Sequence, residues 1–172
     1  MNKAIVMAGG QGSRLWPLTA IRPKPLVPVA NRPVIAHLLH WLRRYHLSEV
    51  LVALHYRAED IRRALGNGRD YGLRITYQVE SEPLGTAGCV KAAEGWIAGE
   101  PFLIASGDAL TDVDLTALQR QHGTRRAWVT LGLKRVHDPS HFGVVGLDAE
   151  GRVQRFQEKP GQGRAFSNPG TG

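Results

Sequence analysis

The sequence predicts an α/β fold with a mostly parallel sheet and helices on both faces. Short apolar, β-branched segments alternate with segments of helical periodicity, which is typical of such a sheet. The segments that carry glycine and acidic residues follow the predicted strands, where ligand sites of parallel sheets lie. The 172 residues are 42% hydrophobic, enough for one buried core. We therefore predict a core domain at 1–160 and a loop-like tail at 161–172.

The first strand is predicted at 3–8, because this segment is apolar and stops at a pair of glycines. Residues 9–33 hold five of the ten prolines, which excludes a continuous helix, and the interleaved apolar residues predict a packed loop. The remaining apolar segments predict strands at 49–54, 73–79, 101–106, 127–133, 143–147 and 153–157, and helices at 34–46, 58–65, 86–98 and 114–122.

The net charge of +7 comes entirely from the first 48 residues, which hold seven basic residues and no acidic one. These cations form no run, so we expect a phosphate site and no nucleic-acid partner. A single cysteine, Cys89, excludes an internal disulfide framework and is interpreted as a buried helix residue. No apolar run is long enough to span a bilayer, and no secretory signal begins the chain. We therefore expect no membrane association and a cytoplasmic location.

The segment GGQGSR at 9–14 follows the first strand and favours phosphate binding, since glycines let backbone amides approach an anion. It matches neither a Walker A sequence nor the dinucleotide fingerprint, and an ordinary strand-to-loop turn is the alternative. The Arg14 guanidinium can bind two phosphate oxygens at once, and the Lys24 ammonium can bind one phosphoryl group. Lys24 lies between two prolines, which restrict its backbone. A solvated lysine in a loop is the alternative for Lys24.

Acidic residues follow the later strands. Asp108 is expected to hold Mg²⁺ at a strand end, with Gly107 leaving room for the ligand, although a turn or helix cap is the alternative. Asp112 and Asp114 are the better candidates for the cap of the helix at 114–122. Glu80 and Glu82, before the small residues at 85–88, could accept the paired donors of guanine or the N–H of uracil, and a surface turn with solvated acids is the alternative. The seven histidines show no metal-ligand spacing.

Together these segments resemble the signature of the sugar-1-phosphate nucleotidyltransferases. The resemblance rests first on AGGQGSRL at 8–15, PLT at 17–19 and PKPL at 23–26. The segments EPLGTAG at 82–88, SGDALTD at 106–112 and FQEKP at 156–160 are most similar to mannose-1-phosphate guanylyltransferases. The resemblance implies a Rossmann-like fold and a transfer from a nucleoside triphosphate, GTP, to a sugar 1-phosphate, mannose 1-phosphate, with release of pyrophosphate.

The resemblance also implies roles for individual residues. Arg14, Lys24 and Asp108 would be catalytic, and Asp108 would bind the cofactor Mg²⁺. Two further sets follow: the nucleotide would bind to Ala8, Gly9, Gly10, Gly12, Ser13, Arg14, Glu80, Gly85 and Thr86, and the sugar phosphate to Gly143, Glu158 and Lys159.

The sequence departs from that family after residue 168. In the family the chain continues with a further strand, more helices and a second metal-binding aspartate, so we expect the carboxyl-terminal part of the family domain to be missing here. We accordingly expect the chain to bind its nucleotide but to catalyse the transfer weakly. We also expect an open sheet edge to favour a homo-oligomer or a complex with a full-length partner. Two alternatives stay open: a uridylyltransferase acting on another sugar phosphate, and a non-catalytic nucleotide-sugar-binding regulatory subunit.

Overall fold

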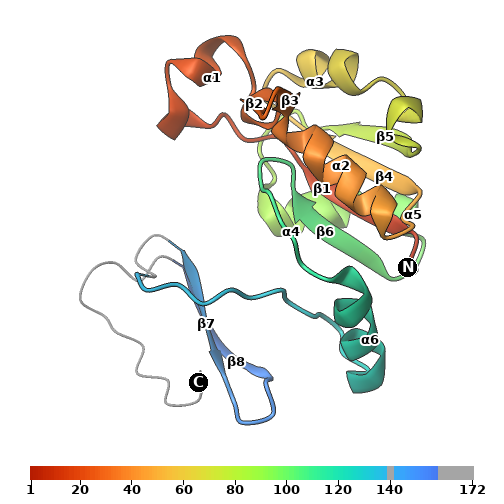
Figure 1. Ribbon diagram of the computed structural model, residues 1–172, viewed down its shortest axis with the longest axis vertical. Coiled ribbons are helices and arrows are strands. Elements are labelled where there is room, and N and C mark those ends of the chain that lie inside the picture. Colours follow the sequence, from red (N-terminus) through yellow and green to blue (C-terminus); the bar gives the residue numbers. More distant parts are fainter. Residues whose placement is uncertain (139–141, 159–172) are drawn as a thin grey trace. The chain divides into compact units, whose positions relative to one another are not determined.

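A computed structural model describes residues 1–138 and 142–158 of the chain. It consists of two compact units, which meet in the sequence between Thr130 and Leu131 (Figure 1). The first unit holds a parallel sheet with its helices, and the described part of the second holds an antiparallel ribbon. The predicted tail at 161–172 lies outside the described residues, as does Lys159.

Four parallel strands form the sheet of the first unit: β1 (Lys3–Met7), β4 (Glu49–Leu54), β5 (Arg74–Val79) and β6 (Phe102–Ser106). Their order is β5-β4-β1-β6, so β1 is paired on both sides. The chain winds outward from β1 through β4 to β5 and then crosses to β6 on the other side of β1. The loops that follow β1 and β6 therefore diverge, and this is the point where parallel sheets bind ligands.

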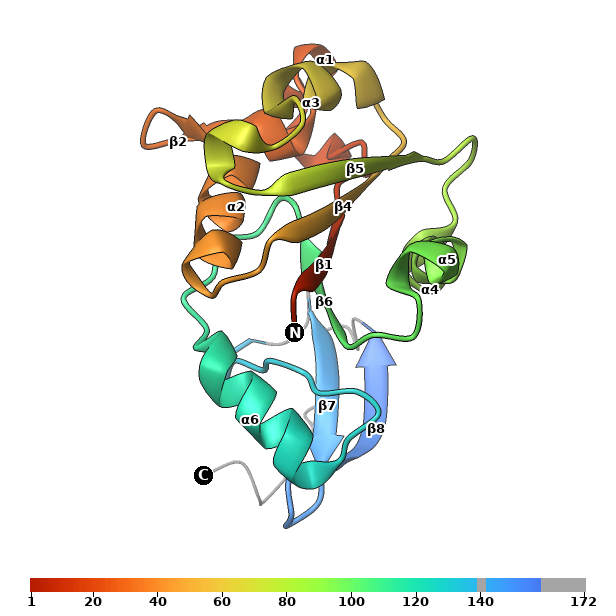
Figure 2. The ribbon, with the colours of Figure 1, turned by 90° about the vertical axis from the view of Figure 1, so that its right-hand side faces the viewer.

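Helices cover both faces of this sheet, as the sequence predicts (Figure 2). One core contains Ala4 and Val6 of β1 and is covered by α2 (Val34–Arg44) and α3 (Ala58–Leu65). Leu115, at the start of α6 (Leu115–Arg125), also joins this core. The other core contains Ile5 and is covered by α4 (Gly85–Ala92) and α5 (Glu94–Ile97). Successive residues of a strand point to opposite faces, so a strand buried on both sides has a continuous apolar sequence.

The segment 9–33 holds short turns and no long helix. It contains 3₁₀ turns at Ser13–Leu15 and Lys24–Leu26, the single turn α1 (Leu18–Ile21), and a ribbon of β2 (Pro28–Val29) and β3 (Arg32–Pro33). The expected packing of its large apolar residues is wrong for Leu15, Trp16, Leu18 and Val29, which are all exposed, Trp16 by 72%. Thr19, Pro23 and Pro25 are buried instead and attach this segment to the unit.

Two other predictions of secondary structure differ from the structure. The helix expected at 86–98 is divided into α4 and α5, which meet at Ala93. The strand expected at 127–133 is absent: in the described chain this segment has no ladder partner, and Trp128 is fully exposed. Apolar, β-branched composition favours a strand only where a neighbouring strand supplies the hydrogen bonds.

The strands predicted at 143–147 and 153–157 do form, as β7 (Gly143–Leu147) and β8 (Val153–Glu158), an antiparallel pair in the second unit. The predicted cap is also present, since the Asp114 carboxylate accepts hydrogen bonds from the amides of Thr116 and Ala117 at the start of α6. Within the described ranges, every helix is too short or too polar to cross a bilayer.

Candidate active site

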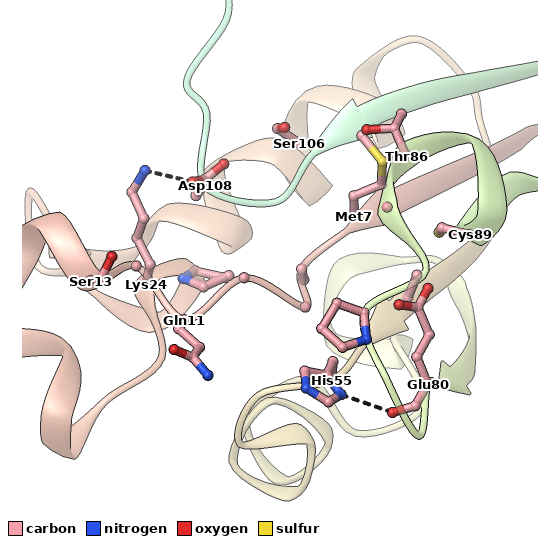
Figure 3. Close-up of a pocket in the computed structure, with 18 of the residues that line it drawn as sticks. Met7, Gln11, Ser13, Lys24, His55, Glu80, Thr86, Cys89, Ser106 and Asp108 are labelled. Carbon is pink, nitrogen blue, oxygen red and sulfur yellow. Dashed lines mark hydrogen bonds and ion pairs between the residues drawn. The ribbon is translucent and has the colours of Figure 1, made fainter.

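A cavity of about 770 Å³ lies in the first unit, at the carboxyl ends of its strands (Figure 3). Eleven of the residues singled out from the sequence line it: Ala8, Gly9, Gly10, Gly12, Ser13, Arg14, Lys24, Glu80, Gly85, Thr86 and Asp108. These residues come from four separate segments of the chain. The fold therefore collects the predicted phosphate, base and metal groups around one volume.

The loop after β1 is tightly packed at Gly12 and open to solvent at Gly10. Gly12 has a φ of +66°, and a Cβ there would lie 3.0 Å from the Cβ of Lys24, so a larger residue would be strained and would displace the lysine. The Thr19 hydroxyl donates to the Gly12 carbonyl at 3.0 Å and fixes the turn. A Cβ on Gly10, by contrast, would meet nothing within 4 Å. The backbone at Gly10 is thus accessible to a ligand in the cavity.

Lys24 and Asp108 form an ion pair across the cavity, with the lysine Nζ 2.6 Å from the Asp108 Oδ2 (Figure 3). Each side chain is about one-third exposed (36% and 33%), so both remain within reach of a ligand. Buried prolines on both sides of Lys24 hold its backbone in place. The structure thus joins the cation of one loop to the carboxylate that follows β6.

Gly107 has a different role from the one expected. A Cβ at this position would lie 3.1 Å from the Met7 carbonyl oxygen, and the Gly107 amide donates to that same oxygen at 2.8 Å. The missing side chain therefore makes room for β1, and the expectation that it makes room for a ligand is wrong. The close approach of β6 to β1 brings Asp108 next to the glycine loop.

Glu80 lines the side of the cavity that faces the glycine loop, and its hydrogen bonds hold the turn between β5 and α4. Its amide donates to the Leu54 carbonyl at 2.8 Å, and one carboxylate oxygen accepts the Leu84 amide at 3.2 Å. That contact shapes the turn that leads into α4 at Gly85, which has a φ of +69°. A carboxylate has about four lone-pair sites, so Glu80 keeps acceptor capacity for a ligand.

Cys89 lines the cavity from α4 but is only 4% exposed. Burial, and then the neighbouring Glu80 carboxylate, raise the pKa of the Cys89 thiol to about 11. The thiolate is the nucleophilic form of cysteine, and it is scarce at neutral pH. Cys89 is accordingly a packing residue of α4, in agreement with its interpretation from the sequence.

The residues expected to bind a sugar phosphate lie in the second unit. Gly143 and Glu158 face each other across the β7–β8 ladder, so the fold brings these two positions together. Lys159, the third residue of that set, lies outside the described residues. Their role in sugar-phosphate binding stays a prediction.

The cavity offers limited support for a metal ion. Among the described residues, no group of three or more histidine, cysteine, aspartate or glutamate side chains could hold one. Asp108 nevertheless supplies an exposed carboxylate beside the glycine loop, and Mg²⁺ commonly takes one or two carboxylates together with substrate phosphates. The donor set therefore fits Mg²⁺ that arrives with a phosphate ligand.

Sequence reasoning missed His55, which follows β4 and lines the cavity. Its ring Nδ1 lies 3.0 Å from the Glu80 carbonyl oxygen. The signal was present, because His55 directly follows the strand predicted at 49–54, just as Gly9 follows the strand predicted at 3–8. Gln11, within the glycine loop, was also not assigned a role, although it too lines the cavity.

Comparisons with known proteins identify the family of the chain. A model of the family described as nucleotidyl transferase matches residues 3–171. The chain belongs to the nucleotidyl transferase family. A mannose-1-phosphate guanylyltransferase of Mycobacterium tuberculosis is 39% identical over 156 residues, which are 91% of this chain and 44% of that protein. A Drosophila melanogaster relative, named mannose-1-phosphate guanylyltransferase catalytic subunit beta, is 36% identical over 92% of this chain and 44% of its own length.

Solved structures of nucleotidyl transferases share the fold. A Bacillus anthracis structure, described as a glucose-1-phosphate thymidylyltransferase with sucrose, superposes with a TM-score of 0.82 at 27% identity. That match covers 92% of this chain and 64% of the other. The α/β fold predicted from the sequence is therefore confirmed. This nucleotidyl transferase chain spans less than half the length of the two curated relatives.

Proposed function

We propose that this chain carries the nucleotide-binding core of a sugar-1-phosphate nucleotidyltransferase. The observation that carries the proposal is the Lys24–Asp108 pair, 2.6 Å apart, beside the glycine loop of the cavity. A cation for phosphate oxygens and a carboxylate for a metal thus meet at the switch point of the sheet. The names of the curated relatives support a sugar phosphate as the acceptor.

In the proposed reaction a phosphate oxygen of the sugar 1-phosphate attacks the α-phosphorus of a nucleoside triphosphate. A new P–O bond forms, the bond from the α-phosphorus to the bridging oxygen breaks, and pyrophosphate leaves with that electron pair. The attacking phosphate is already ionised, so no general base is required. Such transfers depend mainly on positioning and on neutralisation of charge.

The residues of the cavity fit these needs. Backbone amides at Gly9, Gly10 and Gly12 would hold the triphosphate, and the Arg14 guanidinium would bind the leaving pyrophosphate. Lys24 would neutralise charge between the attacking and leaving groups. Mg²⁺, held by Asp108 and by phosphate oxygens, would supply further charge neutralisation when it is bound.

Glu80 favours guanine as the base. A carboxylate can accept the N1–H and the amino group of guanine together, whereas uracil offers one such donor. One Glu80 oxygen already accepts the Leu84 amide, and its remaining lone pairs can serve the base. The mannose-1-phosphate guanylyltransferases among the relatives agree with GTP as donor and mannose 1-phosphate as acceptor. A uridylyltransferase is the alternative, and the competition titration with four nucleotides described below distinguishes the two.

A binding subunit is the second candidate function. One of the curated relatives is named as a catalytic subunit, and that name fits an assembly with other subunits. The described residues that line the cavity all belong to the first unit, which supports a nucleotide site carried by that unit. Tight nucleotide binding without release of pyrophosphate would support this second function.

The proposed function is tested by an assay of pyrophosphate release with Mg²⁺, four nucleoside triphosphates and several sugar phosphates. Arg14→Ala should weaken nucleoside triphosphate binding at least tenfold, because a charge-assisted hydrogen bond contributes about 1.5–3 kcal/mol. Arg44→Ala is the matched control, since Arg44 is an exposed arginine at the end of α2, outside the cavity. Equal effects of both changes in calorimetric titrations would contradict a triphosphate site over the glycine loop.

A second substitution tests the choice of base. Glu80→Gln should reduce the preference for GTP over the other nucleotides by about 1–3 kcal/mol, the usual magnitude of a bidentate base contact. Competition titrations with all four nucleotides measure this preference. Glu82→Gln is the control, because Glu82 is exposed and does not line the cavity. Tighter binding of UTP or ATP than of GTP by the unmodified chain would refute the guanine assignment.

A further inference from the structure

Residues 55–56, which follow β4, contact both the glycine loop at 9–14 and Glu80 on the opposite side of the cavity. On the phosphate side, a Cβ on Gly9 would lie 3.1 Å from the His55 backbone nitrogen, and the Tyr56 amide donates to the Gly9 carbonyl at 3.2 Å. The Tyr56 hydroxyl also donates to the Thr19 carbonyl at 3.1 Å. Residues 55–56 thus lie directly against the glycine loop and the turn that supports it.

On the base side, the His55 ring holds the main chain of Glu80. The two atoms, His55 Nδ1 and the Glu80 carbonyl oxygen, are 3.0 Å apart (Figure 3). A carbonyl oxygen only accepts hydrogen bonds, so the Nδ1 atom must carry the proton and donate. This side-chain bond is added to the backbone bond from the Glu80 amide to Leu54, and both act where β5 gives way to the turn.

The carboxylate of Glu80 depends on that anchored backbone. It accepts the Leu84 amide at 3.2 Å and so lies within the turn that leads to α4. If the carbonyl of Glu80 lost its donor, the peptide plane could rotate and the carboxylate would lose its fixed direction. Selection by a bidentate contact requires that direction, because both acceptor oxygens must meet two donors at once.

We propose that His55 is a positioning residue for base selection, which sets the orientation of Glu80 relative to the glycine loop. The inference rests on the proposed function only in its use of Glu80 to recognise the base. His55 touches the protein backbone through Nδ1 and acts on the base through Glu80. Tyr56, the next residue, donates hydrogen bonds to the carbonyls of Gly9 and Thr19 on the phosphate side. His55 and Tyr56 therefore stabilise different sides of the cavity.

The test compares four chains: the unmodified protein, His55→Ala, His55→Phe and His55→Asn. The Asn side-chain amide can occupy the place of Nδ1 and donate as the imidazole does, whereas Phe keeps a ring without a donor. We expect preference for GTP over the other nucleotides, measured by competition titration, to fall about tenfold in the Ala and Phe variants and to return in the Asn variant. Tyr56→Phe, which loses a hydroxyl on the phosphate side, should keep the preference.

Hydrogen exchange of the backbone at 80–84 provides a readout that needs no ligand. Exchange there should accelerate in His55→Ala and His55→Phe, and remain slow in His55→Asn and Tyr56→Phe. Unchanged exchange and base preference in the Ala and Phe variants would overturn the inference, as would an equal loss of affinity for every nucleotide. An unmodified chain that shows no base preference would refute the guanine assignment of the proposed function instead, while the exchange measurement would still decide whether His55 positions Glu80.

Discussion

Replacing Lys24 with methionine should lower the rate of pyrophosphate release by about 10²–10³-fold, because the removal of one preorganised electrostatic group typically has this effect. The side-chain volume is nearly kept and only the ammonium is lost. In the structure this ammonium is the cation that reaches Asp108 across the cavity. The expected loss is in turnover more than in nucleotide affinity, since the charge that Lys24 meets develops during the transfer.

The fold should survive the change to methionine. The Lys24–Asp108 pair is one-third exposed, and pairs of that kind contribute at most about 1 kcal/mol to the free energy of unfolding. Single-turnover kinetics measure the chemical step, and urea unfolding checks the stability. Lys91→Met is the matched control, because Lys91 forms an exposed ion pair with Glu94 on α4–α5, outside the cavity. Equal turnover of Lys24→Met and Lys91→Met would contradict a catalytic role for Lys24.

Replacing Asp108 with asparagine should have opposite effects on binding and on catalysis. Without its carboxylate partner, Lys24 is free to meet the triphosphate, and a negative charge beside the phosphates is gone. Nucleotide affinity measured in the absence of metal should therefore rise several-fold. With Mg²⁺ present, the rate of pyrophosphate release should fall by about 10²–10³-fold, since a carboxylate metal ligand is lost.

Calorimetric titration of the nucleotide in chelator and in Mg²⁺ separates these two effects. The control is Asp112→Asn, an exposed aspartate four positions further along that does not line the cavity. Because Lys24 and Asp108 pair with each other, Mg²⁺ bound to Asp108 would free Lys24 for the triphosphate, and triphosphate bound to Lys24 would free Asp108 for the metal. A nucleotide affinity that falls in chelator after Asp108→Asn, or that depends on Mg²⁺ as strongly as before, would refute this account of the pair.

Much of this architecture follows from local sequence. Ala4, Ile5 and Val6 are consecutive and apolar, which predicts a strand buried on both faces, and all three are fully buried. Gly9 and Asp108 stand at predicted strand ends, and the rule that ligand sites follow parallel strands brings them to one cavity. The positions of these residues could be predicted because they depend on the topology of the sheet.

Other features depend on contacts between distant segments, which sequence patterns do not contain. A side chain at position 107 would come within 3.1 Å of the Met7 carbonyl oxygen of β1, and His55 acts through the carbonyl of Glu80, which follows a different strand. The segment at 127–133 has strand composition without a ladder partner in the described chain. Trp16 shows the reverse: an apolar side chain in a proline-rich loop was expected to pack, and it lies exposed.

The central position of β1 also bears on how the chain folds as it is synthesised. Lys3 of β1 pairs with Glu49 on one side and with Phe102 on the other, so its second partner is made roughly 100 residues later. At about 5–20 residues per second, the first strand leaves the ribosome several seconds before its sheet can close. Such distant parallel pairing is slow, because the loop must close before the contacts form. During synthesis the apolar residues of β1 are therefore exposed to solvent and to chaperones until its partner strands are made.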